Sequence, residues 1–160
     1  MAQHETKQLL KCLSVFPADV QERALWIRDF IWEAYPDANE LIYDNYNAVA
    51  VGWSPTDRVG HIFASFACGR TSHNVHFGFY YGARLKDPRK LLVGEGNQYR
   101  YILLKDTKTF PAPYVRKLLK EAHKYSLSLV KDQKQIQKGL TIFKSASKKK
   151  RVKKKGAAKS

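Results

Sequence analysis

The segment from residue 74 to residue 106 constrains the fold more than any other part of the chain. Residues 74–81 alternate apolar and polar side chains, the period of a strand with one buried face, and the apolar set is Val75, Phe77, Phe79 and Tyr81. The glycines of Gly94-Glu95-Gly96 supply the backbone freedom for a sharp reversal into another strand over residues 99–105. The segment therefore predicts two strands of a sheet, and it identifies no reaction.

Two helices are predicted, one before and one after the strands. Residues 17–35 begin with a proline suited to a first helical turn and are followed by Pro36, which ends the pattern. Their apolar side chains recur at helical spacing in one stripe: Val20, Ala24, Ile27, Ile31 and Ala34. Residues 112–130 have a second such stripe, made of Val115, Leu118, Leu119, Ala122 and Leu129. Each segment is therefore expected to pack one face on a core.

Further strand patterns cover residues 46–53 and 61–68, and a weaker pattern starts near Leu41. Helix, antiparallel strands and helix, in that order, make an α+β two-layer sandwich. We expect an antiparallel sheet of about 4–6 strands, with the N-terminal and the C-terminal helix on one of its faces.

The domain organisation follows from where the apolar pattern ends. We expect one α+β domain over residues 1–132 and a polar to Lys-rich tail over residues 133–160, because the tail has too little apolar content to order itself. Residues 138–143 leave two alternatives open, a further strand or a weakly docked segment.

The composition is that of a globular protein, since 44% of the residues are hydrophobic. The first residues carry no basic flank followed by an apolar run, and no run has the length that spans a bilayer. Cys12 and Cys68 fit no metal or redox spacing, so two reduced thiols are expected. We therefore expect a cytoplasmic protein with no membrane partner.

The net charge of +15 is unevenly distributed. Nine basic residues and no acid lie between Lys144 and Ser160, which leaves a charge of +6 for residues 1–143. Residues 17–44 hold seven acids and only two arginines. An acidic early segment is thus combined with a strongly basic end, and polyanions are the partners that a basic end attracts.

Three segments in order carry a family resemblance: FPADVQERALWIRDFIWEAYPDANELI, VHFGFYYGARLKDP, and LLVGEGNQYRYILLKD leading into VRKLLKEAHKY. With Pro-Asp-Ala at 36–38 and Leu-x-Gly-x-Gly at 92–96, residues 14–129 resemble the YdhG-like family, a domain of unknown function in the superfamily of frataxin-like small α/β proteins (CyaY, YjbR). The resemblance implies a frataxin-like fold and no catalytic residues. Because some frataxin-like relatives handle iron, it also implies weakly bound iron as a ligand.

The acidic face of the first helix is the candidate metal site. Glu22, Asp29 and Glu33 lie within about 40° of one another on a helical wheel, and Asp37 continues the acidity past the helix end. Carboxylate oxygens suit hard cations such as Fe²⁺, and frataxin-like proteins are similar in using an acidic ridge on their first helix. Two alternatives are an ordinary solvated face and a face that complements the lysines of the second helix.

The sheet face away from the helices is the candidate anion site. If Val75 and Phe77 face the helices, His76 and Tyr80 face outward, and Arg100 joins them when the strand register agrees. A guanidinium beside the Gly94–Gly96 turn would bind phosphate or carboxylate through two donors. The alternative is an arginine that bridges strand and turn carbonyls.

The basic tail is the candidate nucleic-acid interface. Its lysines and arginine would bind DNA or RNA by counterion release, without reading the sequence, and no aromatic residue lies among them. The residues concerned are Lys148, Lys149, Lys150, Arg151, Lys153, Lys154 and Lys155. The alternative is a solubilising tail with no dedicated partner.

The sequence favours a binding module over an enzyme, because Ser65, Ser72 and Cys68 lack a nucleophile elbow or a base at a diagnostic spacing. The first hypothesis is binding of a metal ion such as iron in a frataxin-like chaperone role. The second is a nonspecific nucleic-acid-associated protein acting through its tail. The third is a small-anion-binding protein or an unrecognised enzyme.

Overall fold

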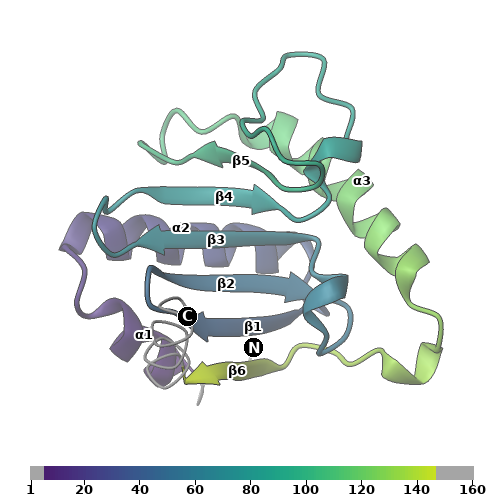
Figure 1. The fold of residues 1–160 in the computed structure, drawn as a ribbon, viewed down its shortest axis with the longest axis horizontal. Coiled ribbons are helices and arrows are strands. Elements are labelled where there is room, and N and C mark those ends of the chain that lie inside the picture. The colour runs from purple at the N-terminus through teal and green to yellow at the C-terminus, as the bar shows by residue number, and fades with distance from the viewer. Residues whose placement is uncertain (1–5, 147–160) are drawn as a thin grey trace, which may run out of the picture.

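The computed structural model describes residues 6–146, which form an α+β fold (Figure 1). In this part of the chain there are three α-helices: α1 (Thr6–Leu13), α2 (Ala18–Ala34) and α3 (Ala112–Leu129). They accompany one sheet of six strands: β1 (Asn39–Asp44), β2 (Ala48–Ser54), β3 (Ala64–Gly69), β4 (Val75–Phe79), β5 (Arg100–Leu103) and β6 (Thr141–Ala146). Within these residues, no helix has the length and apolar character that crossing a membrane would require.

The sheet is mixed, because its last strand runs parallel to its neighbour. The strand order is β5-β4-β3-β2-β1-β6, and every pair is antiparallel except β1 with β6. The prediction of an antiparallel sheet is therefore wrong at the β1–β6 edge. Two parallel neighbours need a long connection, and α3 is part of the chain that connects β1 to β6. Of the two alternatives left open for residues 138–143, the structure shows the strand, which starts at Thr141. The sheet thus extends past the boundary expected at residue 132.

Both predicted helices are confirmed to within one residue at each end. Pro17 precedes α2 with the fixed φ of a helix start, and Asp19 lies in the first turn, where the helix dipole favours an acid. The stripe Val20, Ala24, Ile27 and Ile31 is buried, as are Val115, Leu118, Leu119 and Ala122 of α3. The last residue of each predicted stripe differs, since Ala34 is exposed and Leu129 half-buried. The helical periodicity therefore identified most of the residues that face the core, while Arg28 and Trp32 are buried outside the predicted stripe.

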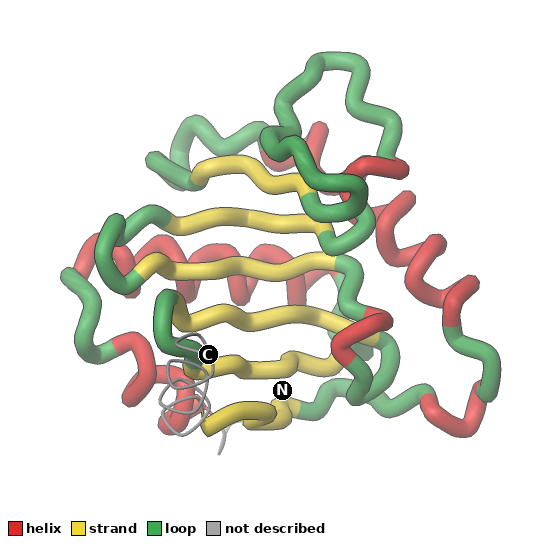
Figure 2. Tube along the Cα trace, in the orientation of Figure 1, coloured by secondary structure: helices red, strands yellow, loops and turns green. Residues whose placement is uncertain are grey.

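The core lies between α2 and the sheet. α2 runs along the sheet behind β3, as Figure 2 shows, and contacts β3 and β4. The Phe30 ring contacts Phe77 at 6.0 Å and Phe110 at 5.6 Å between ring centroids. Phe66 and Phe77 are fully buried, and each such side chain stabilises the fold by about 1.5–3 kcal/mol. The Arg116 guanidinium of α3 lies over the Phe30 ring, so α3 packs beside α2.

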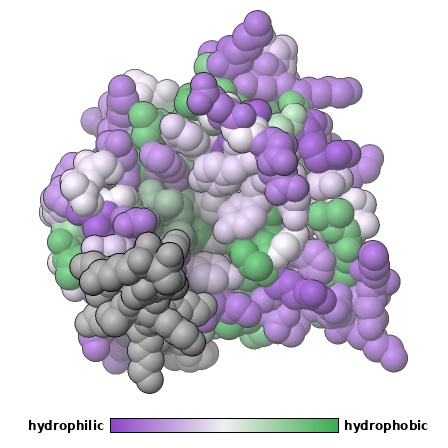
Figure 3. All heavy atoms as spheres, viewed as in Figure 1, coloured by the Kyte–Doolittle hydropathy of each residue, from purple (hydrophilic) through white to green (hydrophobic). Residues whose placement is uncertain are grey.

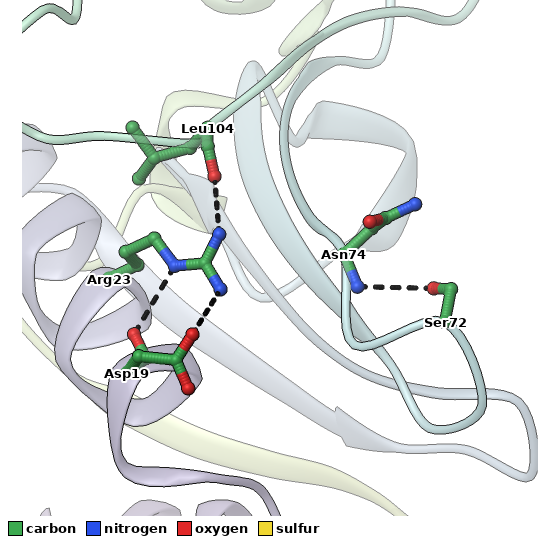
Figure 4. Close-up of polar contacts among 5 residues, drawn as sticks. All are labelled: Asp19, Arg23, Ser72, Asn74 and Leu104. Carbon is green, nitrogen blue, oxygen red and sulfur yellow. Dashed lines mark hydrogen bonds and ion pairs between the residues drawn. The ribbon is translucent and has the colours of Figure 1, made fainter.

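Arg23 ties α2 to the end of the β5 segment (Figure 4). Its Nη1 donates to the Leu104 carbonyl at 2.9 Å, and its Nη2 donates to the Asp19 carboxylate at 3.1 Å. At the turn between β3 and β4, the backbone N–H of Asn74 donates to the Ser72 hydroxyl at 3.1 Å. The helix is thus held over the sheet by polar contacts in addition to its apolar stripe.

A buried ion pair joins α2, β1 and β6. Arg28 is 7% exposed and Glu40 is 0% exposed, and the guanidinium donates to both carboxylate oxygens at 2.6 and 2.9 Å. The Thr141 hydroxyl on β6 donates to the same carboxylate at 2.9 Å. Next to it, the fully buried Asn39 side chain donates to the Gln137 carbonyl and accepts from the Leu140 N–H. Side chains of β1 therefore position the last strand.

Removing one partner of the Arg28–Glu40 pair is expected to destabilise the fold much more than removing both. Arg28→Met leaves a buried carboxylate without its cation, which is expected to lower the free energy of unfolding by about 3–5 kcal/mol. The double variant Arg28→Met, Glu40→Met buries no charge and is expected to recover most of this loss. Urea unfolding of both variants measures the difference. A double variant no more stable than Arg28→Met would contradict this account.

Candidate functional site

One face of the sheet carries no helix from the described residues, and we call it the open face. α2 contacts β3 and β4 through the row that contains Val51, Phe66 and Phe77, so residues one position along each strand point to the other side. Figure 1 is viewed onto that side, with α2 behind the strands. The row that crosses the open face includes Gly52, Ser65, Gly78 and Tyr101.

Four aromatic side chains form a continuous row on the β4–β5 side of the open face, and we call it the aromatic row: His76, Tyr80, Tyr99 and Tyr101. The His76 and Tyr101 rings are stacked, with centroids 4.3 Å apart and planes 6° from parallel. Tyr101 in turn stacks on Tyr99 at 6.1 Å, and Tyr99 meets Tyr80 edge to face at 6.1 Å. The order along the row is therefore His76, Tyr101, Tyr99, Tyr80.

Small residues beside the aromatic row leave room for it. A Cβ at Gly78 would lie 2.6 Å from Cζ of Tyr99, so that ring rests directly over the backbone of β4. Ala67 lies opposite His76, and Ser65 opposite Gly78, in the pairing of β3 with β4. Figure 3 shows weakly polar and apolar residues at the centre of this face and hydrophilic residues around it. The strands thus present aromatic rings above a floor of short side chains.

His76, Tyr80 and Tyr99 of the aromatic row are uncharged at neutral pH. Burial lowers the pKa of His76 below its ordinary value of 6.5, which keeps the imidazole neutral. Burial also raises the pKa of Tyr80 to about 12 and is the largest cause of the raised pKa of Tyr99. The row is therefore an aromatic surface with neutral polar groups, which suits packing against a planar ligand and not the binding of a bare anion.

The loop between β4 and β5 brings Tyr99 and Tyr101 into position. Val93 and Tyr101 exchange two backbone hydrogen bonds, at 2.8 and 2.9 Å, so the chain reverses between them as the glycine turn predicted. Gly94 has a φ of +137°, a conformation that side chains with a Cβ rarely adopt. The glycines therefore fix the strand that completes the aromatic row.

Arg100 does not join His76 and Tyr80, so the structure corrects the anion site as it was proposed. Arg100 pairs with Phe79, whose ring is in the core. Its Cβ lies so close to Gly82 that a Cβ added at that glycine would be only 2.5 Å away. Its Nη1 donates to the carbonyls of Gly96 at 2.5 Å and Tyr99 at 2.8 Å. The register places the guanidinium on the other row, and the alternative interpretation, an arginine bridging strand and turn carbonyls, is confirmed.

The four acids of the expected metal site lie on the surface. Glu22, Asp29, Glu33 and Asp37 are all exposed. Within residues 6–146, no three His, Cys, Asp or Glu side chains are grouped closely enough to hold a metal ion. Two neighbouring acids of the same segment, Asp19 and Glu40, are instead paired with Arg23 and Arg28. The described residues therefore provide exposed carboxylates but no enclosed set of ligands for an iron ion.

The basic residues of the expected nucleic-acid interface, Lys148 to Lys155, lie outside the described residues. Their attachment point is described: β6 ends at Ala146, at the edge of the sheet opposite β5. Five strand spacings of about 4.8 Å separate the two edges, so roughly 24 Å of sheet lies between β5 and β6. The basic segment thus continues from a strand of the same sheet that carries the aromatic row.

The candidate nucleophiles are held in structural roles. Cys68 is buried and Cys12 half-buried, and both are free thiols. The fully buried Thr56 hydroxyl lies 2.7 Å from His61 Nδ1 and accepts the Arg58 N–H at 3.1 Å, so this pair closes the loop after β2. Ser65 is 5% exposed beneath Tyr99.

Cys68 is expected to be inert toward thiol reagents in the folded protein. Burial raises the pKa of its thiol to about 12, so almost no thiolate is present at pH 8. With Ellman's reagent at pH 8, Cys68 is expected to react only as fast as the protein unfolds, whereas the half-buried Cys12 reacts first. A Cys12→Ser variant isolates the Cys68 rate. Rapid reaction of that variant under native conditions would contradict the burial of this thiol.

Acidification from pH 7 to about pH 5 is expected to lower the free energy of unfolding. Burial is the largest cause of the lowered pKa of His61, His76 and His123. Below pH 6.5 the unfolded chain therefore takes up protons that the folded chain excludes, and stability is lost as the pH falls toward the folded pKa values. Urea unfolding at a series of pH values measures this loss. His123→Phe is expected to flatten the slope, and an unchanged slope would contradict the assignment.

Comparison of the chain with models of known protein families, with curated proteins and with solved structures found no match. The resemblance to YdhG-like and frataxin-like proteins therefore rests on the short sequence motifs alone.

Proposed function

We propose that the protein binds single-stranded nucleic acid, with bases stacked on the aromatic row and phosphates attracted by the basic residues. The stacked rings of His76 and Tyr101, on a sheet face that no described helix covers, are the observation that carries this proposal. Stacking of a base on an aromatic side chain contributes about 1–3 kcal/mol and tolerates any base, because every base has a π face.

Charge supports the same ligand. The chain has 29 lysines and arginines and only 14 acids, and a polyanion bound by such a surface releases its counterions. The neutral aromatic rings do not themselves attract phosphate, so the aromatic row and the basic residues bind different parts of the nucleic acid. The row holds bases, and the lysines hold the backbone.

The geometry favours single strands over duplexes. In a duplex the base faces are covered by their neighbours, whereas an unpaired strand can turn its bases onto a sheet. A strand that crossed the open face from β5 to β6 would pass over the short side chains of β3 and over Ile62, which lies against Gly52 of β2. It would then reach β6, which ends at Ala146, two residues before the first lysine of the basic segment.

The frataxin-like fold and the iron-binding role remain proposals beside nucleic-acid binding. The two predicted helices beside one face of the sheet agree with a frataxin-like two-layer sandwich, with β6 as an added parallel strand, and the motif order supports a YdhG-like domain. The iron-binding role is the weaker proposal, because its four carboxylates are exposed and ungrouped. An anaerobic ferrous titration of the Glu22→Gln, Asp29→Asn, Glu33→Gln variant against the wild type would distinguish the two functions.

Loss of the aromatic row is expected to weaken binding of single strands. The double variant His76→Ala, Tyr101→Ala removes the stacked pair, which is expected to raise the Kd by about 5- to 150-fold, since one lost base stack costs about 1–3 kcal/mol. Fluorescence anisotropy with labelled single-stranded RNA and DNA measures the Kd of the full chain. The same titration with a duplex of equal length is expected to show weaker binding and no effect of the double variant.

The control variant is Tyr46→Ala, which removes an aromatic ring that is 58% exposed on the turn after β1 and lies outside the aromatic row. It is expected to leave the Kd unchanged. Truncation after Ala146 is expected to reduce the salt dependence of the affinity while leaving the effect of the double variant in place. If truncation abolished binding and the double variant had no effect, the tail would act alone and the proposed role of the open face would be wrong.

A further inference from the structure

A groove runs between the end of α2 and the middle of α3, away from the open face, and we call it the α2–α3 groove. Two adjoining hollows form it, with volumes of about 280 and 490 Å³. They share four residues, which makes the groove continuous: Ala34, Tyr35, His123 and Leu127. Volumes of this size are those of sites for small organic ligands.

The wall of the groove is aromatic and apolar. The Tyr35 ring lies against His123 with centroids 4.4 Å apart, and His123 packs edge to face on the buried Phe63 at 4.9 Å. Burial lowers the pKa of His123, so its ring is neutral at physiological pH. Leu127 is 39% exposed although it lines both hollows, and Ile136 extends the apolar lining at one end. The groove therefore offers an unpartnered apolar surface to a ligand.

The rim of the groove is positively charged. Arg116, Lys120 and Lys124 line one hollow, and Lys138 and Asp37 line the other. In the described part of the chain, no carboxylate forms an ion pair with Arg116, Lys120 or Lys124. The Arg116 guanidinium instead lies over the Phe30 ring, 5.0 Å from its centroid. Arg116 also lines a third, smaller hollow beside the groove, together with Phe30, Glu33 and Ala34. The three cations on α3 therefore line the groove with no described carboxylate in an ion pair with them, although the groove and the adjoining hollow also have the acids Asp37 and Glu33 in their lining.

We propose that the α2–α3 groove binds an amphiphilic anion, a ligand with an acyl or aromatic body and one carboxylate or phosphate head. The body packs on Tyr35, Leu127 and Ile136, and the head lies near Arg116, Lys120 and Lys124. Apolar burial supplies most of the affinity, while the cations select an anionic head over a neutral one. The groove and the open face are formed by different residues, so this inference is independent of the proposed nucleic-acid binding.

The test uses the full chain and the fluorescent probe 1-anilinonaphthalene-8-sulfonate, an aromatic anion whose emission rises in apolar sites. Four competitors separate the contribution of the apolar body from that of the anionic head: dodecanoate, dodecyl phosphate, dodecanol and inorganic phosphate. The three dodecyl compounds are used below the concentrations at which they self-associate. Dodecanoate and dodecyl phosphate are both expected to displace the probe, and the tighter of the two identifies the preferred head. Dodecanol, which has the body but no anionic head, is expected to displace it several-fold less well than dodecanoate, and inorganic phosphate, which has no body, is expected to displace it hardly at all.

Two variants assign the binding to the groove. Arg116→Gln, Lys120→Gln removes two rim cations and is expected to weaken dodecanoate binding by about fivefold. Its matched control, Lys117→Gln, Lys131→Gln, removes the same charge from exposed positions that line neither hollow, and is expected to change the affinity by less than about twofold. Ala34→Trp places a large ring in both hollows from an exposed position at the end of α2 and is expected to block binding.

Thermal unfolding shows that each variant is folded before it is titrated. The proposal is overturned by probe binding that does not saturate, or by dodecanol competing as well as dodecanoate. It is also overturned if the control variant loses as much affinity as the rim variant, or if Ala34→Trp binds like the wild type. His76→Ala, Tyr101→Ala is expected to keep full probe binding, which separates a failure here from a failure of the proposed nucleic-acid site.

Discussion

The buried ion pair between Arg28 and Glu40 is the interaction on which the arrangement of the other elements depends. Neither charge is stable alone in the core, so α2 and β1 must come together in the one geometry that satisfies both. Because the same carboxylate accepts the hydroxyl of Thr141, the position of β6 follows from the pair as well. One carboxylate therefore contacts the helix, the first strand and the last strand at once, and the face opposite α2 is left for other contacts.

Periodicity and prolines made most of the fold predictable from the sequence. Both long helices and four of the strands were found because their apolar residues recur at a single spacing and their ends are marked by Pro17, Pro36 and Pro111. The parallel β6 could not be assigned in the same way. It is held by Asn39 and Glu40, which are 98 to 101 residues away from their partners, and no local pattern encodes such a contact. The short α1 was also missed, since eight residues give only two turns.

The alternation of side chains along a strand predicted which residues share a face of the sheet, and this was the only part of the candidate sites that the sequence predicted. Alternation placed His76 and Tyr80 on the outward face, and Tyr99 and Tyr101 flank Arg100 in the sequence, so the pattern contained the aromatic row. The register of β5 then decided which of these three residues faced outward, and it selected the tyrosines over the arginine. The α2–α3 groove depends on how two helices meet, which a sequence pattern does not contain. The acidic residues of α2 gave a clear pattern that the fold leaves spread over the surface.

The position of β6 has a consequence for how the chain folds during synthesis. β1 pairs with β2 through neighbouring residues, but its other edge stays open until a strand made about a hundred residues later arrives. Pairing over that separation is slow, because a long loop must close before the contact forms. An unpaired strand edge is an aggregation hazard during this interval. The nascent protein therefore has a late and vulnerable step, which ends only when the last strand has left the ribosome and paired with β1.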